Sequence, residues 1–256
     1  MYRKSLLRKR FNEGKKAFGC WVQILDPEVT EILSMVGFDF LLIDNEHGPG
    51  DVISLLHQLR AAAATETTPV VRIPWNDPIY IKKILDIGVE AVMVPMVETV
   101  EQAKAAVAAC RYPPRGIRGI AHTDARASDY GLKATEYLET ASDNTFIICQ
   151  IESGTAVENV EKIAAVDGID MLFMGPFDLS ASLGRPADFD NPRHKEAMAK
   201  CEAAIKGAGK SMGGIAYGKY SPKDLFERGY DLVVGAIDVG LLRDGALEKV
   251  KQHRPS

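Results

Sequence analysis

The chain has 256 residues, of which 46% are hydrophobic and 26% are charged, and its 31 basic and 35 acidic side chains give a net charge of −4. This composition is typical of a globular protein and excludes a disordered chain, a collagen-like repeat and a small disulfide-rich domain. The lack of a basic excess argues against a nucleic-acid partner, and no apolar run reaches the roughly 18 residues of a membrane span.

Basic residues cluster near the N-terminus, where we expect the solvated face of a first helix. No apolar segment follows them, so the sequence does not predict a secretory signal. The four cysteines lie far apart and form no C-x-x-C pair. They therefore indicate reduced thiols in a cytoplasmic protein, and neither a disulfide framework nor a zinc site.

Eight short apolar segments, each bounded by Gly, Pro or Asp, alternate with helical stretches, as buried parallel strands do. The predicted strands are Phe18–Ile24, Phe38–Ile43, Pro69–Ile73, Ala91–Pro95, Phe146–Ile151, Met171–Met174, Met212–Ala216 and Leu232–Gly235. The predicted helices are Pro27–Val36, Ile79–Ile87, Glu98–Cys110, Ser153–Val166 and Pro192–Ala208. Asp26 and Asp77 each precede a proline, which predicts a helix cap at both positions.

Alternating strands and helices predict an α/β fold with a parallel sheet, and eight strands close a (β/α)8 TIM barrel of about 250 residues. A doubly wound open sheet is the alternative. It would carry a glycine fingerprint after the first strand, where this sequence has Asp26–Pro27. Arg111–Asp143 is interpreted as an extended loop plus a helix, although Ile117–Ile120 within it could form a further strand. We predict one barrel domain over residues 1–256.

Polar side chains follow four of the predicted strands. In a barrel, the C-terminal ends of the strands meet at one rim, which supplies the catalytic residues. This rim would collect Asp44, His47, Arg72, Gln150, Glu152 and Asp178. Any one of them could be a turn, cap or structural residue. Six on one rim are difficult to explain by folding alone, and an arginine inside an apolar strand is costly unless it is paired or functional.

The residue types at this rim favour chemistry on a 2-oxo acid. Glu152 and Asp178 offer oxygen ligands, which favour Mg²⁺ or Mn²⁺, with Co²⁺ as a further candidate. A bound cation would polarise the keto acid, and Arg72 would hold a developing oxyanion. His47, oriented by Asp44, would move a proton. No lysine lies inside a predicted strand, so a Schiff-base route is disfavoured.

Six segments then identify a family resemblance. They are Phe40–His47, Val71–Pro78, Val94–Val97, Arg111–Gly119, Gln150–Glu152 and Gly175–Ser180. With these segments in this order and spacing, the sequence resembles the 4-hydroxy-2-oxoheptanedioate aldolase family of class II, metal-dependent pyruvate aldolases. The resemblance extends from about Gly19 to Leu242.

The resemblance implies a TIM barrel whose C-terminal helix is exchanged between subunits of a homohexamer. It implies that Glu152 and Asp178 hold the metal and that Arg72 contacts the pyruvate oxygen. His47 and Asp44 would act through a metal-bound water. Asp86 matches a residue that the family supplies from a neighbouring subunit, although its sequence context alone indicates a solvated helix end. The other candidates for substrate binding are Gln150, Gly175, Pro176, Phe177, Trp21, His122 and Arg126.

The long loop departs from the family pattern at Ile120–Asp124, where extra polar groups precede Ala125-Arg126-Ala127. If this loop faces the aldehyde, we expect a more polar acceptor than succinic semialdehyde.

The sequence thus predicts a lyase that reversibly cleaves a 4-hydroxy-2-oxo acid to pyruvate and an aldehyde, without a membrane partner. The alternatives are an oxaloacetate decarboxylase or other pyruvate-enolate chemistry, an acyl-CoA lyase of the citramalyl or malyl type, and a catalytically silent binding barrel.

Overall fold

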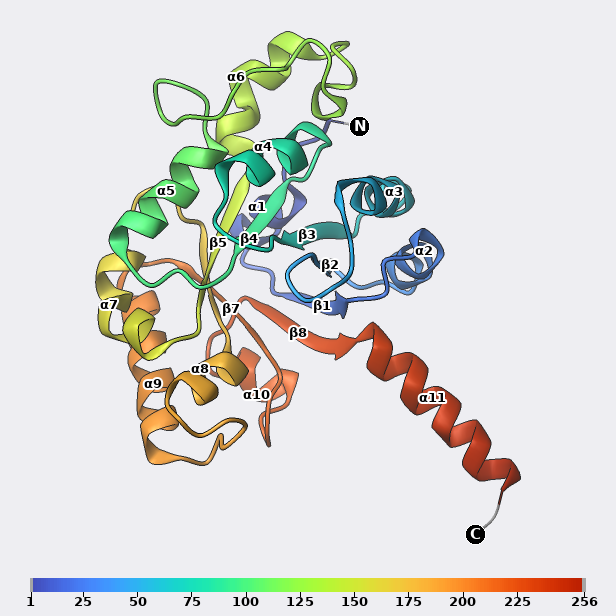
Figure 1. The fold of residues 1–256 in the computed structure, drawn as a ribbon, viewed down its shortest axis with the longest axis vertical. Helices are drawn as coiled ribbons and strands as arrows, with labels where there is room; N and C mark the ends of the chain where they lie inside the picture. Colours follow the sequence, from blue (N-terminus) through green and yellow to red (C-terminus); the bar gives the residue numbers. More distant parts are fainter. Residues whose placement is uncertain (1, 255–256) are drawn as a thin grey trace.

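The short apolar segments of the sequence form a closed barrel of eight parallel strands (Figure 1). In this computed structural model, which describes residues 2–254, each strand pairs with the next in sequence and β8 pairs with β1. The strands are β1 (Ala17–Val22), β2 (Phe40–Asp44), β3 (Thr68–Arg72), β4 (Ala91–Val94), β5 (Phe146–Ile151), β6 (Met171–Met174), β7 (Ser211–Ile215) and β8 (Leu232–Ile237). The predicted TIM barrel is confirmed.

Helices surround the barrel and connect its strands. They are α1 (Leu6–Asn12), α2 (Pro27–Met35), α3 (Val52–Ala62), α4 (Pro78–Asp86), α5 (Val100–Cys110), α6 (Ala134–Asn144), α7 (Gly154–Ala164), α8 (Pro176–Ser182), α9 (Pro192–Gly207), α10 (Pro222–Glu227) and α11 (Asp238–His253), with a short 3₁₀ helix η1 (Arg126–Ser128). The caps predicted before α2 and α4 are present, because Asp26 accepts a hydrogen bond from Glu28 N and Asp77 accepts one from Ile79 N.

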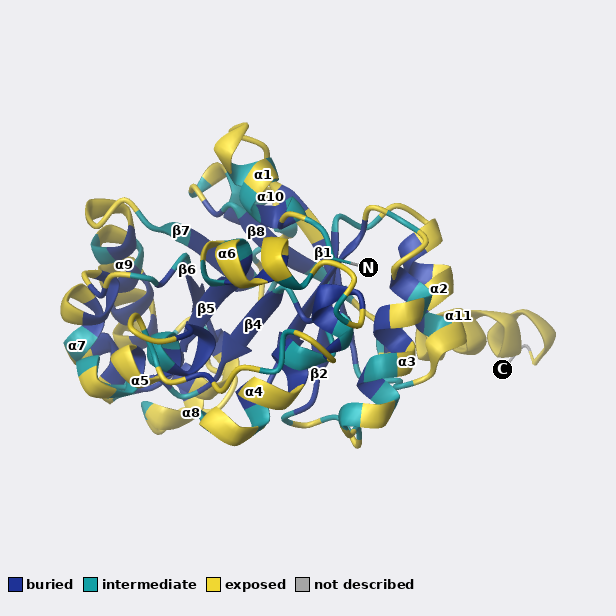
Figure 2. Cartoon of the chain, turned by 90° about the horizontal axis from the view of Figure 1, so that it is seen from above, coloured by how far each residue is buried: buried dark blue, intermediate teal, exposed yellow. Residues whose placement is uncertain are grey.

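Two apolar layers hold the barrel together. An outer layer lies between the strands and the helices, and an inner layer fills the barrel with alternate residues of the strands. Figure 2 shows the buried strands inside the ring and exposed residues on the outer faces of the helices. The inward-facing series Phe40, Leu42 and Asp44 runs from apolar to polar toward the C-terminal end of β2. The same alternation directs Arg72 and Gln150 into the mouth of the barrel.

Most differences from the predicted elements concern boundaries and short helices. β5 and β6 have the predicted limits, whereas β1 ends at Val22, two residues before the predicted end. The segment Arg111–Asp143 forms a loop that leads through η1 into α6, and Ile117–Ile120 adds no strand. The helices α3, α8 and α10 were not among the predicted ones.

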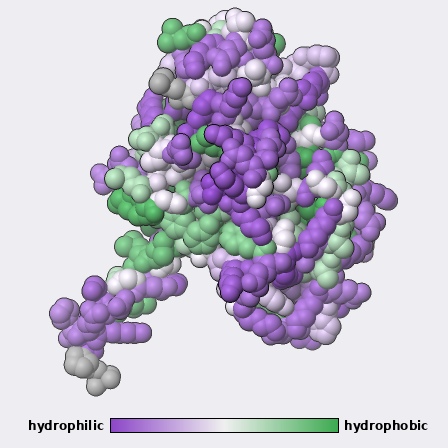
Figure 3. Space-filling view, turned by 180° about the vertical axis from the view of Figure 1, so that it is seen from behind, coloured by the Kyte–Doolittle hydropathy of each residue, from purple (hydrophilic) through white to green (hydrophobic). Residues whose placement is uncertain are grey.

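The C-terminal helix α11 projects away from the barrel (Figure 1). Within it, Leu241, Leu242, Leu247 and Val250 are all about half exposed or more. Figure 3 shows apolar side chains gathered where this helix leaves the body of the molecule. Among the described residues, no helix is both long and apolar enough to cross a membrane.

Candidate active site

The C-terminal ends of four strands, β2, β3, β5 and β6, bring most of the predicted residues to one mouth of the barrel. Asp44 is the last residue of β2 and Arg72 the last of β3, and the two are paired in the strand register. Gln150 lies in β5 and Glu152 directly follows that strand. Asp178 lies in the first turn of α8, which begins two residues after β6. Strand register and alternation therefore create this cluster.

Arg72 is held by three side chains at once. Its Nε and Nη2 donate to the two carboxylate oxygens of Asp44 at 2.9 and 2.7 Å. Its Nη1 lies 2.8 Å from Glu46 Oε2, and its guanidinium carbon lies 4.5 Å from the centre of the Trp21 ring. The side chain is 5% exposed. Because these contacts hold all three guanidinium nitrogens and one face of the group, its charge is fixed at the mouth of the barrel, while Nη1 and Nη2 each keep a second N–H.

Asp44 is the acceptor at the centre of this network. Besides Arg72, it accepts hydrogen bonds from Trp21 Nε1 at 3.1 Å and from Gln23 Nε2 at 3.3 Å. Burial by itself would raise the pKa of Asp44, but the hydrogen bond and charge of Arg72 outweigh it and lower the pKa to about 2. Asp44 is therefore ionised at neutral pH.

The predicted contact between Asp44 and the ring of His47 takes a different form. Asp44 Oδ1 accepts from the backbone N–H of His47 at 3.3 Å, and among the residues that the structure describes no hydrogen bond joins the two side chains. The His47 side chain is exposed next to the cluster. Because the carboxylate of Asp44 accepts from Arg72, Trp21, Gln23 and backbone N–H groups, it does not hold the imidazole, which can turn toward a ligand.

Glu46 also belongs to the cluster, although no role was predicted for it. Burial raises its pKa above the ordinary value, the charges of Asp44 and Asp178 add to this, and Arg72 and His47 oppose it. Its position two residues after Asp44, at the end of the same strand, is the sequence feature that could have indicated a place in the cluster. Its partner Arg72 could only be identified from the strand register.

Glu152 is a buried carboxylate, 2% exposed, at the end of β5. Its Oε1 accepts from Met96 N at 2.7 Å, and its Oε2 accepts from Gln150 Nε2. Met96 has a φ of 51°, a strained conformation for a residue other than glycine, and this turns its N–H toward Glu152. Burial raises the pKa of Glu152 to about 8, the Met96 N–H opposes this, and the charges of Asp178 and Glu46 add to it.

The donor set fits a hard divalent cation. A buried carboxylate with a raised pKa beside a second carboxylate is destabilised by like charge, which a cation would relieve. Gly175 leaves the necessary space, since a Cβ there would lie 2.7 Å from Glu152 Oε2. Within residues 2–254, no three side chains among His, Cys, Asp and Glu form a metal-binding group. Glu152 and Asp178 would supply two oxygen donors, and water and substrate commonly fill the remaining positions around Mg²⁺.

Several further candidates line the same region. The Oε1 of Gln150 is buried without a hydrogen-bond partner among the described residues, as expected of a group that awaits a ligand or water. Trp21 is buried against Arg72, while Gly175 and Pro176 are buried at the start of α8. Phe177 is 48% exposed.

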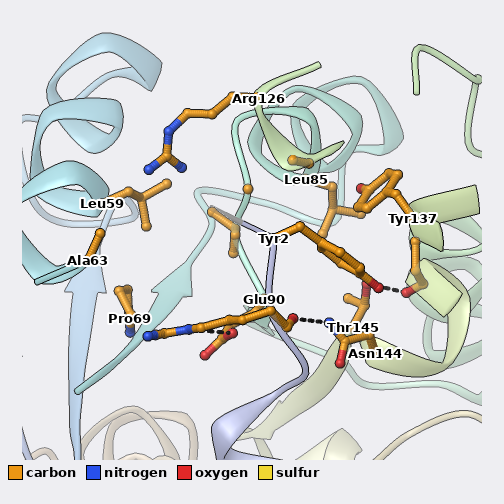
Figure 4. Close-up of a pocket in the computed structure, with 15 residues that line it drawn as sticks. Tyr2, Leu59, Ala63, Pro69, Leu85, Glu90, Arg126, Tyr137, Asn144 and Thr145 are labelled. Carbon is orange, nitrogen blue, oxygen red and sulfur yellow. Dashed lines mark hydrogen bonds and ion pairs between the residues drawn. The ribbon is translucent and has the colours of Figure 1, made fainter. Parts of the chain in front are cut away.

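Three predicted residues do not join this cluster within the chain. Asp86 ends α4 and pairs with Arg118 at 2.7 Å. Arg126 donates to Ile87 O and lines a cavity of about 350 Å³, together with residues that precede β4 and β5 (Figure 4). His122 is half-buried in the loop before η1. Asp86 and Arg126 thus adjoin the edge where the strands begin, opposite the candidate site.

Comparison with known proteins gives a consistent result. The family model described as HpcH/HpaI aldolase/citrate lyase matches residues 17–245. A hydroxypyruvate/pyruvate aldolase of Chromohalobacter salexigens is 40% identical over 242 residues, which are 94% of this chain and 95% of the relative. A 4-hydroxy-2-oxo-heptane-1,7-dioate aldolase of Salmonella typhimurium is 41% identical over 246 residues, or 95% of this chain and 92% of that one.

Solved structures share the fold as well. An HpcH/HpaI aldolase/citrate lyase family protein of Burkholderia cenocepacia superposes with a TM-score of 0.92 at 37% identity, and the match covers 97% of this chain and 98% of the other. The likeness therefore extends over the whole barrel.

Proposed function

Because the chain belongs to the HpcH/HpaI aldolase/citrate lyase family, we propose that it is a carbon–carbon lyase that cleaves a 4-hydroxy-2-oxo acid reversibly to pyruvate and an aldehyde, with a divalent metal. The observation that carries the proposal is the meeting of Arg72, Glu152 and Asp178 at one mouth of the barrel. A fixed positive charge and two carboxylates are what binding and activation of an anionic keto acid require.

Glu152 and Asp178 would hold the cation, and Mg²⁺ or Mn²⁺ suits their oxygen donors. When bound, the cation supplies positive charge that polarises the keto group of the substrate. Arg72 would hold the oxygen on which negative charge develops, because its guanidinium is already fixed by Asp44 and Glu46. Gln150, with one buried oxygen unpartnered among the described residues, would contact pyruvate or a water.

His47 is the proposed proton carrier, since its exposed imidazole lies beside the cluster. In the cleavage direction it would accept the proton of the C4 hydroxyl. The C3–C4 bond then breaks, its electron pair forms the enolate of pyruvate, and the aldehyde leaves. A proton delivered to C3 gives pyruvate. Asp44 would keep Arg72 in place and would contact His47 only through the backbone.

The test is an assay of pyruvate release from a panel of 4-hydroxy-2-oxo acids, with and without a chelator. We expect release that stops when the metal is removed and returns with Mg²⁺ or Mn²⁺. Release that survives complete metal removal would contradict the metal mechanism. Turnover of oxaloacetate or of a citramalyl- or malyl-CoA thioester, without release from any panel member, would identify a different reaction at this site. An inactive borohydride adduct with pyruvate would indicate a lysine Schiff base instead.

We also propose that the protein acts as a homo-oligomer, a hexamer by resemblance, in which α11 packs against a second copy. The support is the half-exposed apolar side chains on this projecting helix, which a partner chain would cover. Residues 1–256 would form one catalytic domain per chain. A cytoplasmic location agrees with the four cysteines, which are all free and buried.

A further inference from the structure

A group of aromatic rings packs against the turn that carries Asp178. This aromatic cluster consists of Phe177 of α8, Phe189, His194 of α9 and Tyr217. Phe189 lies at its centre, with ring centroids 5.1 Å from Phe177, 5.6 Å from His194 and 5.3 Å from Tyr217. All three contacts have the edge-on geometry that aromatic rings prefer.

His194 is the buried polar member of the aromatic cluster, 1% exposed. Its Nε2 lies 3.1 Å from the carbonyl oxygen of Pro176. Because a carbonyl can only accept, Nε2 carries the proton and donates it. Burial lowers the pKa of His194 below its ordinary value, which favours this neutral ring. The hydrogen bond joins α9 directly to the first residue of α8, two residues before Asp178.

Helices α8 and α9 differ greatly in length and in N-terminal capping. Helix α8 has seven residues, and no side chain caps its N-terminus. Helix α9 has sixteen residues and is capped by Asn191, which accepts from Arg193 N at 3.0 Å. A short, uncapped helix is a weak support for a metal ligand. Its neighbour can supply the missing constraint.

We propose that His194 is a positioning residue for the metal site: its hydrogen bond to Pro176, together with the Phe189 ring against Phe177, fixes the turn that presents Asp178 to the cation. The inference rests on the proposed function only in taking Asp178 as a ligand. When a residue that orients a metal ligand without touching the metal is removed, the metal affinity commonly falls about 10- to 100-fold.

The test measures Mn²⁺ binding by the electron paramagnetic resonance signal of free Mn²⁺, and hydrogen–deuterium exchange of the peptide that contains residues 175–183. For His194→Phe, which keeps a ring but removes the donor, we expect about tenfold weaker Mn²⁺ binding and faster exchange in α8. His194→Gln, whose amide can donate to Pro176, should recover most of the affinity. The Mn²⁺ affinity separates positioning from a merely structural role.

The matched control is Cys201→Ala. Cys201 is buried on α9 about two turns beyond His194, so this variant should lower the melting temperature without changing Mn²⁺ affinity or exchange in α8. If His194→Phe does not fold, Phe189→Leu, which removes the central ring, should still weaken Mn²⁺ binding.

The proposal is overturned if a folded His194→Phe or Phe189→Leu variant binds Mn²⁺ as the unmodified protein does, or if the unmodified protein binds no Mn²⁺. If Mn²⁺ binding weakens as expected but no 4-hydroxy-2-oxo acid is cleaved, the positioning role stands and the proposed function fails.

Discussion

At the scale of single residues, the arginine at the barrel mouth shows how a buried charge can serve both folding and binding. Arg72 is nearly inaccessible, yet it has two carboxylate partners and an aromatic face. Its removal would leave Asp44 buried and ionised, and breaking such a pair costs about 3–5 kcal/mol. Its replacement must therefore preserve the charge if the chemistry is to be tested separately from stability.

We expect Arg72→Lys to slow the exchange of pyruvate methyl protons with D₂O by about 10²- to 10³-fold, because lysine cannot bind Asp44 and an enolate oxygen with the same fixed geometry. The exchange is followed by NMR. Arg115→Lys is the matched control, since Arg115 pairs with Asp143 on the exposed surface. An exchange rate within twofold of the unmodified protein for Arg72→Lys would remove Arg72 from the mechanism.

The buried carboxylate of Glu152 predicts a pH dependence of stability in the metal-free protein. Its pKa is raised to about 8, mainly by burial, whereas the pKa of a glutamate in the unfolded chain is about 4.3. Between these values the folded state holds a proton that the unfolded state has lost. Stability from this group is thus complete below about pH 4 and is lost as the pH rises through about 8.

We therefore expect the melting temperature of the metal-free protein to fall relative to that of Glu152→Gln as the pH rises from about 5 to about 8. Mg²⁺ affinity should rise over the same range, because binding displaces the proton. Thermal unfolding and calorimetry in buffers of different ionisation enthalpy measure the two effects. A melting-temperature difference that is independent of pH would mean that Glu152 is ionised throughout.

The sequence was sufficient to name the strand-end residues but insufficient to describe their contacts. Asp44, Arg72, Gln150 and Glu152 follow from the rule that barrel strands deliver side chains to one rim. The contact between Arg72 and Glu46 depends on side-chain conformations around the register of β2 and β3. The left-handed Met96 could not be predicted, because this conformation is adopted by few non-glycine residues.

At the scale of secondary-structure elements, the turn from β6 into α8 depends on the absence of a side chain at Gly175. A Cβ at this position would meet the Glu152 side chain at 2.7 Å and Gln150 Nε2 at 3.0 Å. Both neighbours are buried and hydrogen-bonded to each other, so neither can move without breaking that bond. The turn from β6 into α8 can therefore lie this close to Glu152 and Gln150 only if residue 175 is glycine.

We expect Gly175→Ala to lower Mg²⁺ affinity at least tenfold, because the turn must move away from Glu152 to relieve the contact. Calorimetric titration with Mg²⁺ measures this. Gly207→Ala is the matched control, since a Cβ at the end of α9 meets no atom within 4 Å. If both variants bind Mg²⁺ equally well, α8 tolerates displacement and its close approach is not required.

The accuracy of the predicted elements follows their length and burial. β5 and β6 are buried at every residue and bounded by polar or turn residues, so their limits were predicted correctly. Helices α8 and α10 have seven and six residues, too few for a helical repeat to be recognisable. Helix α3 was not predicted, although its sequence does carry a helix signal: the Asp51 cap precedes the buried positions Leu55, Leu59 and Ala62.

At the scale of the whole molecule, the barrel separates the predicted site residues between its two edges. Each helix runs back against its strand, so the end of α4 lies at the edge where strands begin. Asp86 is therefore remote from Arg72 in the same chain, where it pairs with Arg118. Asp86 can contribute to catalysis only if assembly brings it to the mouth of a neighbouring barrel, as the family resemblance implies.

This separation can be tested by combining two defective chains. We expect Asp86→Ala and Arg72→Lys to be nearly inactive when each is expressed alone. In a mixed assembly, co-expressed with two affinity tags and purified through both, some sites receive Arg72 from one chain and Asp86 from another. Random assortment would restore about a quarter of the unmodified activity, since each intact residue is present in half of the chains.

The control pairs Arg72→Lys with Glu152→Gln, two residues of the same mouth. If a site draws both from one chain, no mixed assembly contains an intact site, and activity should stay at the level of the single variants. Restoration in the Asp86 mixture alone would show that two chains build one site. Equal failure of both mixtures would confine catalysis to the residues of a single barrel, and α11 would then serve assembly without completing the site.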